Sequence, residues 1–210
     1  MKDSKSQESK LTSEISTVVF DLSEVLLTGL LGMREPLATR LGLSSEEIDF
    51  KVPELQMLFE GKISEEHFWE ALLREQGWAI EIEELKNLVR ENFLEIEGTK
   101  NIVEEVKRAG YQVALFSVHA SEWIAFCEEK FDHGALFEQN VYSFQIGICK
   151  PEKRAFEILV EQLSVSADSI LFIDDSDSNI VSAKEVGMQT LLFTSAEQLR
   201  ADLVRAGLLA

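Results

Sequence analysis

The sequence is poor in cysteine, and its first residues lack the apolar stretch of a secretory signal. Two cysteines, Cys127 and Cys149, occur among 210 residues. They are too few for a disulfide framework, and neither has a Cys or His nearby at metal-ligand spacing. We therefore predict two reduced thiols in a cytoplasmic protein; the alternative is a single bridge between them. Residues 1–14 are polar and mixed in charge, so we predict a disordered tail there.

Long apolar runs and basic residues are also scarce. The unbroken apolar stretches are far shorter than the roughly 18 to 20 residues that a membrane-spanning helix needs. Lysine and arginine number 20 against 38 aspartate and glutamate residues, a formal net charge of −18. Because nucleic acids and anionic bilayers are bound by clustered cations, we predict neither nucleic acid nor a membrane as a partner. One small anion at a single local site remains compatible with this charge.

Glycine and proline, at 11 and 3 residues, are too sparse for a turn-rich all-β protein. Short β-branched and aromatic runs alternate instead with helical segments whose ends are marked by Thr99, Ser121 and Pro151. This alternation predicts an α/β fold with a Rossmann-like, doubly wound parallel sheet. The predicted strands are Thr17–Phe20, Tyr111–Phe116, Asn140–Phe144, Ile170–Ile173 and Gln189–Phe193.

Residues 33–98 contain several short amphipathic helix patterns and no convincing strand. We predict that they form a helical cap domain, inserted into an α/β core domain of residues 15–32 and 99–210. The cap segment holds 16 acidic and 7 basic residues, which is half of the excess negative charge. We interpret this acidity as a solvated helix surface.

The residues that end the predicted strands are the candidates for a site, because ligands of open α/β sheets bind beyond the carboxyl ends of the strands. Three anionic groups, a hydroxyl group and one lysine are expected to converge there. We place Val118 and His119 on the substrate side of this site. The full set of candidates is Asp21, Ser23, Ser117, Val118, His119, Lys150, Asp174 and Asp175.

Converging carboxylates raise one another's pKa unless a cation neutralises them. Mg²⁺ takes hard oxygen ligands, commonly carboxylates together with water and a substrate phosphate. Lys150 supplies a second positive charge that can offset both a nucleophilic carboxylate and a phosphoryl oxygen. The set therefore predicts phosphoryl transfer to a carboxylate nucleophile, with Mg²⁺ as the cofactor.

Four segments resemble the motifs of the haloacid dehalogenase-like superfamily, in the subfamily with a helical cap after the first strand. VVFDLSEVLL resembles the first motif, LFS the second, KPEKRAF the third and LFIDDSDSNIVSAKEVGM the fourth, which is the most specific. LFEGKISEEHFWEAL is similar to the cap of the small sugar-phosphate phosphatases of that branch. The likeness covers nearly the whole chain after the tail.

The resemblance implies a role for each candidate. Asp21 would be the nucleophile that forms an aspartyl-phosphate, with Ser117 and Lys150 binding the phosphoryl group. The groups implied to bind Mg²⁺ are the side chains of Asp21 and Asp174 and the main-chain carbonyl of Ser23, with Asp175 as a supporting or further metal-site carboxylate. The implied substrate is a small phosphorylated metabolite, and the protein would be a monomer or a homodimer. The cap loop Glu60–Lys62 is expected to face the site.

Two positions depart from the family pattern. The phosphatases usually carry a second Asp two residues after the nucleophile, which protonates the leaving oxygen and then activates water; here that residue is Ser23. Loss of a positioned acid/base commonly slows a reaction by about 10² to 10⁴. Val118 stands where an Asn commonly follows the Ser of the second motif. Glu24 and His119 are the two candidates to replace the missing acid/base, although a plain loop histidine is the other interpretation of His119.

Two functions follow as hypotheses. The first is a Mg²⁺-dependent phosphohydrolase with altered acid/base chemistry. The second is a catalytically impaired family member that binds a phosphate or a protein partner. Retention of Asp21, Ser117, Lys150 and Asp174 favours the first, and the changes at Ser23 and Val118 favour the second.

Overall fold

Five parallel strands form the sheet at the centre of the protein, whose computed structural model describes residues 14–210. All of the predicted tail except Glu14 lies outside the described residues. The strands are β1 (Thr17–Phe20), β2 (Gln112–Ser117), β3 (Gln139–Tyr142), β4 (Ile170–Asp174) and β5 (Gln189–Leu192). Their order in the sheet is β3-β2-β1-β4-β5, so β1 lies in the middle with β2 and β4 as its neighbours. The predicted α/β fold with a parallel sheet is confirmed.

Each predicted strand is found within two residues of its expected ends. The largest difference is at β3, which stops at Tyr142, so that Ser143 and Phe144 lie in the short helix α7 (Ser143–Ile146). Gly147 ends that helix in a left-handed conformation, with φ at 73°. The helix turns the chain at the carboxyl end of β3, where a longer strand had been predicted.

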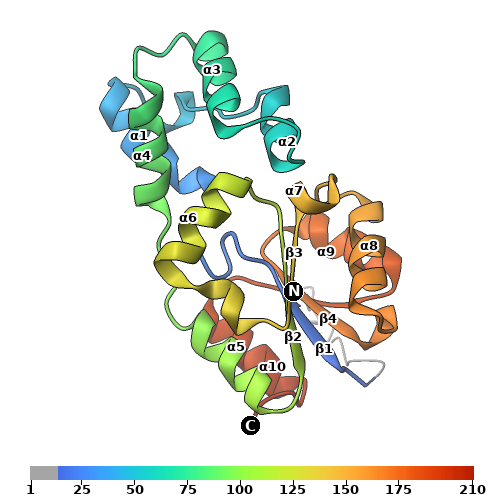
Figure 1. Cartoon of the computed structure of the whole chain (residues 1–210). Coiled ribbons are helices and arrows are strands. Elements are labelled where there is room, and N and C mark those ends of the chain that lie inside the picture. The colour runs from blue at the N-terminus through green and yellow to red at the C-terminus, as the bar shows by residue number, and fades with distance from the viewer. Residues whose placement is uncertain (1–13) are drawn as a thin grey trace, which may run out of the picture.

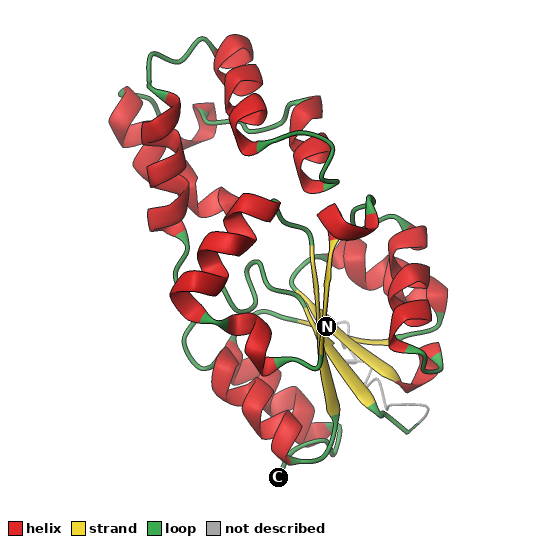
Figure 2. Ribbon diagram, in the orientation of Figure 1, coloured by secondary structure: helices red, strands yellow, loops and turns green. Residues whose placement is uncertain are grey.

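Helices cover both faces of the sheet (Figures 1 and 2). Alternate strand residues point to opposite faces: Val18 and Phe20 of β1 join one buried apolar cluster, and Val19 joins the other. The first cluster includes residues of α5 (Thr99–Arg108), α6 (Ser121–Phe131) and α10 (Ala196–Arg205). The second includes residues of α8 (Lys153–Leu163) and α9 (Asp177–Val186). This two-sided burial explains why the strands read as continuous apolar runs.

A helical segment lies between β1 and β2, above α6 and α7 in Figure 1. We call residues 30–92 the inserted segment; its four α-helices and two short 3₁₀ helices agree with the helix patterns in the sequence. The elements of the inserted segment are η1 (Leu30–Met33), α1 (Arg34–Leu41), η2 (Ser45–Glu47), α2 (Pro53–Phe59), α3 (Glu65–Gln76) and α4 (Ile82–Asn92). Ser64 caps α3, because its side-chain oxygen accepts a hydrogen bond from the His67 N–H at 3.3 Å.

The remaining helix ends refine the expected ones. Thr99 is the first residue of α5, and Gly98 is its N-cap with φ at 89°. Helix α6 begins at Ser121 as expected. Helix α8 begins at Lys153, so Pro151 lies two residues before it rather than in its first turn. Two short 3₁₀ helices, η3 (His133–Leu136) and η4 (Ala167–Ser169), complete the elements. Across residues 14–210, no helix has both the length and the apolar character required to span a bilayer.

Both cysteines are free and buried. Burial raises the pKa of the Cys127 thiol to about 12 and that of Cys149 to about 11. A raised thiol pKa reduces the thiolate fraction at neutral pH, and the thiolate is the reactive species. We expect a disulfide reagent to label the native protein at least about 10²-fold more slowly than the protein in denaturant. Equal labelling rates in the two conditions would contradict this burial.

Candidate active site

The ends of three neighbouring strands bring the central site residues together. Asp21 directly follows β1, Ser117 ends β2 and Asp174 ends β4. Because β1 pairs with both β2 and β4 in parallel register, these three carboxyl ends lie side by side. The Asp21 N–H donates to the carbonyl of Ile173 at 2.9 Å, so the pairing of β1 with β4 extends to Asp21 itself. The sheet thus assembles residues that are more than 150 positions apart in the sequence.

Lys150 occupies the centre of this site. Its Nζ lies 2.9 Å from Asp21 Oδ1 and 2.7 Å from Asp174 Oδ2, and it donates to the Phe116 carbonyl at 3.0 Å. The ammonium group also lies over the rings of Phe116 and Phe172, at 5.2 and 5.3 Å from their centroids. Burial favours the neutral amine, but the charges of Asp21 and Asp174 outweigh it and raise the Lys150 pKa. The side chain is therefore a fixed cation between two carboxylates.

Asp174 is also held in place by hydrogen bonds from Asn179 and Ser176. The Asn179 Nδ2 donates to both of its carboxylate oxygens, at 2.8 and 3.0 Å, and the Ser176 N–H donates to Oδ1 at 2.9 Å. Asn179 lies in the first turn of α9, five residues after Asp174. This contact of Asn179 with Asp174 was not predicted from the sequence. The position of Asn179 in the fourth motif was the signal that could have indicated it.

Asp21 is buried and in an electrostatically unfavourable position for a carboxylate. Burial raises its pKa to about 8; Lys150 opposes this rise and Asp174 adds to it. The Leu22 N–H donates to Oδ1 at 2.7 Å. Since Lys150 also contacts Oδ1, both of these contacts engage one oxygen of the carboxylate. The other oxygen, Oδ2, is left as the candidate reactive atom.

Asp21, Asp174 and Asp175 form a cluster that could hold a metal ion, because each offers an oxygen and these oxygens all lie within 4.8 Å of one another. Asp175 is more exposed than the other two, and its pKa is raised by partial burial and then by the charge of Asp174. Three carboxylates face one ammonium group, so a divalent cation would balance the remaining charge. The donor set, all oxygen, fits Mg²⁺.

Ser117 carries a further indication of a ligand. Its side chain is fully buried, and its hydroxyl has no hydrogen-bond partner. A buried polar group without a partner is unfavourable by about 1–3 kcal/mol. A phosphoryl oxygen above the strand ends would accept a hydrogen bond from this hydroxyl.

Ser23 and Glu24 lie in the loop after Asp21. Ser23 is half-buried, and its hydroxyl is a poor acid and a poor base at neutral pH. Glu24 has a φ of 59°, in the left-handed region that non-glycine residues rarely adopt. The Gly29 N–H donates to Glu24 Oε1 at 2.7 Å. One oxygen of the Glu24 carboxylate is therefore engaged in shaping this loop.

His119 lies among aromatic side chains. It is 2% exposed, and its ring centroid is 5.3 Å from that of Phe93 and 5.7 Å from that of Trp123. Burial lowers its pKa to about 4, so the imidazole is neutral at pH 7. The backbone N–H of His119 donates to Ser143 Oγ at 3.1 Å. The structure thus places the imidazole in packing against α6 rather than with the carboxylates. Val118 is half-buried beside it.

The loop Glu60–Lys62 of the inserted segment packs against α7 and lies near Cys149, the residue before Lys150. A Cβ atom on Gly61 would come within 2.6 Å of the Phe144 carbonyl oxygen, and Gly61 has a φ of 70°. Only glycine permits this approach to α7. Lys62 Nζ pairs with Glu60 Oε2 at 2.5 Å, and Glu60 and Lys62 both influence the pKa of Cys149, the residue before Lys150.

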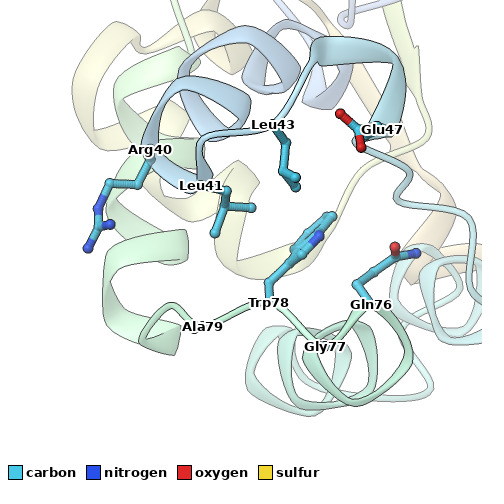
Figure 3. Close-up of a pocket in the computed structure, with 8 residues that line it drawn as sticks. All are labelled: Arg40, Leu41, Leu43, Glu47, Gln76, Gly77, Trp78 and Ala79. Carbon is cyan, nitrogen blue, oxygen red and sulfur yellow. The ribbon is translucent and has the colours of Figure 1, made fainter.

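A separate hollow of about 660 Å³ lies within the inserted segment (Figure 3). Trp78 and Leu43 point into it, and Arg40 lies at its side, where it pairs with Glu84 of α4. None of the residues that line it belongs to the carboxylate cluster. The chemistry of the side chains, rather than the size of a cavity, therefore identifies the candidate active site.

Comparison with known proteins finds relatives in sequence and in fold. The D-ribitol-5-phosphate phosphatase of Bacteroides thetaiotaomicron is 28% identical over 154 residues, covering 70% of this chain and 75% of that protein. A chloroplast flavin mononucleotide hydrolase of Arabidopsis thaliana is 26% identical over 132 residues, covering 63% of this chain. The chain spans about half, 54%, of that relative's length.

A solved structure of a haloacid dehalogenase family enzyme from Bacteroides thetaiotaomicron, in complex with magnesium and inorganic phosphate, superposes with a TM-score of 0.71. It is 20% identical, and the match covers 86% of this chain and 95% of that one. At this identity the likeness shows the fold. The family described as haloacid dehalogenase-like hydrolase matches residues 44–193, well over half of the sequence. The chain belongs to the haloacid dehalogenase-like hydrolase family.

Proposed function

We propose that the protein is a Mg²⁺-dependent phosphohydrolase that acts on a small phosphorylated metabolite through an aspartyl-phosphate at Asp21. The single observation that carries the proposal is the grouping of Asp21 and the partnerless Ser117 hydroxyl at adjoining strand ends, with Lys150 Nζ 2.9 Å from Asp21 Oδ1. It joins a nucleophile, a cation and a free hydrogen-bond donor. Such a set suits a phosphoryl group, which carries negative charge on several oxygens.

The relatives support the same chemistry. Two of them are named for the hydrolysis of D-ribitol 5-phosphate and flavin mononucleotide, both of which are phosphate monoesters. The superposed enzyme from Bacteroides thetaiotaomicron holds magnesium and inorganic phosphate. From these relatives we infer that the cleaved bond is that of a phosphate monoester and that the cofactor is Mg²⁺. We assign no particular metabolite.

Each residue of the candidate site would have a separate role in the reaction. Asp21 Oδ2 would attack phosphorus while Lys150 holds Oδ1 and partly offsets the charge on the phosphoryl oxygens. Ser117 would donate a hydrogen bond to one of those oxygens. Asp21, Asp174, Asp175 and the Ser23 carbonyl would hold Mg²⁺, which supplies electrostatic stabilisation of the transferring phosphoryl group. Water would then hydrolyse the aspartyl-phosphate.

Proton transfer would be the slow part of this reaction. The family's second Asp is replaced by Ser23, so protonation of the leaving oxygen and activation of water would be slow. This same observation supports the second candidate function, a family member that binds phosphate with little or no turnover. The two functions differ in whether phosphate is released.

Metal removal tests the proposal. A panel of phosphate monoesters, including p-nitrophenyl phosphate and sugar phosphates, is incubated with the protein in Mg²⁺ or in EDTA, and released phosphate is measured. We expect release in Mg²⁺ and a loss of about 10²-fold or more in EDTA, because the carboxylate cluster would lose its cation. Binding of phosphate without release from any ester would instead establish the second function. Equal release in Mg²⁺ and EDTA would contradict the metal site.

A further inference from the structure

Glu65, the first residue of α3, is a buried carboxylate outside the candidate active site. It is 2% exposed and accepts hydrogen bonds from three side chains. The indole N–H groups of Trp69 and Trp123 donate to Oε1 at 3.1 and 2.8 Å. Arg90 donates from Nη1 to Oε1 at 2.9 Å and from Nη2 to Oε2 at 2.7 Å. A carboxylate with four such donors is rigidly placed.

These donors come from two different parts of the chain. Trp69 and Arg90 belong to α3 and α4 of the inserted segment, whereas Trp123 belongs to α6, which follows β2 (Figure 1). A second bond crosses the same boundary, because the Glu65 N–H donates to Glu122 Oε1 at 3.0 Å. The start of α3 is therefore tied to the start of α6 at two points.

Both connected elements lead directly to the candidate active site. Helix α3 begins three residues after Lys62, at the end of the loop that packs against α7. Helix α6 begins four residues after Ser117. A tie between these two helix starts fixes the position of the loop Glu60–Lys62 relative to the strand ends.

Because the donors to Glu65 belong to two parts of the chain, the link between α3 and α6 can break while Glu65 keeps some of its partners. If the inserted segment swings away from α6, Arg90 and Trp69 move with Glu65, and Trp123 stays behind. The Glu65 carboxylate then keeps its bonds to the Arg90 guanidinium and to the Trp69 indole. An unpaired buried charge would be strongly unfavourable, and this separation does not create one. Of the hydrogen bonds described above, those from Trp123 and from the Glu65 N–H would break, and the ring contacts of Trp123 with Phe59, Phe68 and Trp69 would separate with them.

We propose that Glu65 is a positioning residue that holds the loop Glu60–Lys62 closed over the candidate active site through its bond to Trp123. The kinetic consequence rests on the proposed phosphohydrolase function, whereas the closure itself does not. The ionised carboxylate is the stable form, because the bonds from Arg90, Trp69 and Trp123 outweigh the effect of burial and lower the Glu65 pKa.

Two matched variants separate closure from simple stability. Trp123→Phe and Trp69→Phe each remove one indole N–H from Glu65 Oε1 and keep an aromatic ring in place. Only the first removes a bond between the inserted segment and α6. A third variant, Glu122→Ala, removes the other crossing bond at a half-buried surface position.

Labelling of Cys149 measures closure without any assay of activity. Cys149 is 7% exposed, and its pKa is influenced by Glu60 and Lys62 of the loop. We expect a thiol reagent, with the labelled cysteine identified by mass spectrometry, to modify Cys149 about tenfold faster in Trp123→Phe than in the parent. Glu122→Ala should be accelerated in the same direction. Trp69→Phe should label at the parent rate, and equal acceleration in both tryptophan variants would overturn the proposal.

Kinetics with p-nitrophenyl phosphate and a sugar phosphate then test the consequence for the site. In Trp123→Phe we expect KM to rise about tenfold for the sugar phosphate, with a smaller change in kcat, because the open form binds the leaving group poorly. Thermal melting of all three variants accounts for any loss of fold. Accelerated labelling with no turnover in any variant would uphold the closure and reject the phosphohydrolase. Parent-like labelling in Trp123→Phe, with turnover intact, would reject the closure alone.

Discussion

An Asp21→Asn variant will lose phosphate-ester hydrolysis by about 10⁴-fold or more while keeping its fold. The amide oxygen is a far weaker nucleophile than the carboxylate, so no aspartyl-phosphate forms. The variant also removes a charge that the fold accommodates poorly, since burial raises the Asp21 pKa to about 8. Lys150 keeps its 2.7 Å contact with Asp174. We therefore expect a melting temperature equal to or above that of the parent.

The measurements are phosphate release with Mg²⁺, and thermal melting in EDTA. Asp177→Asn is the matched control, because it makes the same chemical change at an exposed residue of α9 beside the site. It should retain parental turnover. Mass spectrometry after exposure to an acyl phosphate should detect a phosphorylated parent and an unmodified Asp21→Asn protein. Turnover in Asp21→Asn within tenfold of the parent would remove Asp21 from the nucleophile's role.

The fold was largely predictable because its strands are buried on both faces. The runs that became β1 and β4 contain almost only β-branched, aliphatic and aromatic residues, so their ends are marked by the first polar side chain. Strand β3 was less well defined, since Gln139 and Asn140 are half-buried at its start. The turn of the chain at Ser143 depends on tertiary packing of α7, which local propensity does not report.

The central site residues were predictable for a related reason. Asp21, Ser117 and Asp174 each end a strand, and parallel strands place such residues on one rim. The contact of Lys150 with the nucleophilic carboxylate Asp21 was expected from charge, whereas its second contact, with Asp174, was not predicted. The engagement of Glu24 with Gly29 and the burial of His119 were not predicted either, because both depend on the path of a loop.

The Glu65 cluster could not be predicted from the sequence. Glu65 reads as an ordinary acidic residue in the first turn of a helix, where acidic side chains are common. Its partners Arg90 and Trp123 lie 25 and 58 positions away. Most of the acidic residues that we assigned to a solvated helix surface have no such burial, and no sequence signal separates Glu65 from them.

A Ser23→Asp variant should accelerate the hydrolysis of alkyl phosphates by about 10² to 10⁴, with little change for p-nitrophenyl phosphate. An alkoxide leaving group needs a proton in the transition state, whereas a nitrophenolate needs little help. The new carboxyl group would stand two residues after Asp21, near three other carboxylates, and like charges raise a carboxyl pKa. A raised pKa suits a group that must first give up a proton and then accept one.

The diagnostic quantity is the ratio of kcat/KM for a sugar phosphate to that for p-nitrophenyl phosphate, measured with Mg²⁺ in the parent, Ser23→Asp and Ser23→Asn. Asn matches Asp in size, but its amide does not exchange a proton as an acid or base near neutral pH, so only Ser23→Asp should increase the ratio. If the parent hydrolyses the sugar phosphate as fast as p-nitrophenyl phosphate, proton delivery is already efficient without an acid at position 23. The acid/base must then be another group near the strand ends, and Glu24, whose second carboxylate oxygen is not engaged by Gly29, becomes the first residue to substitute.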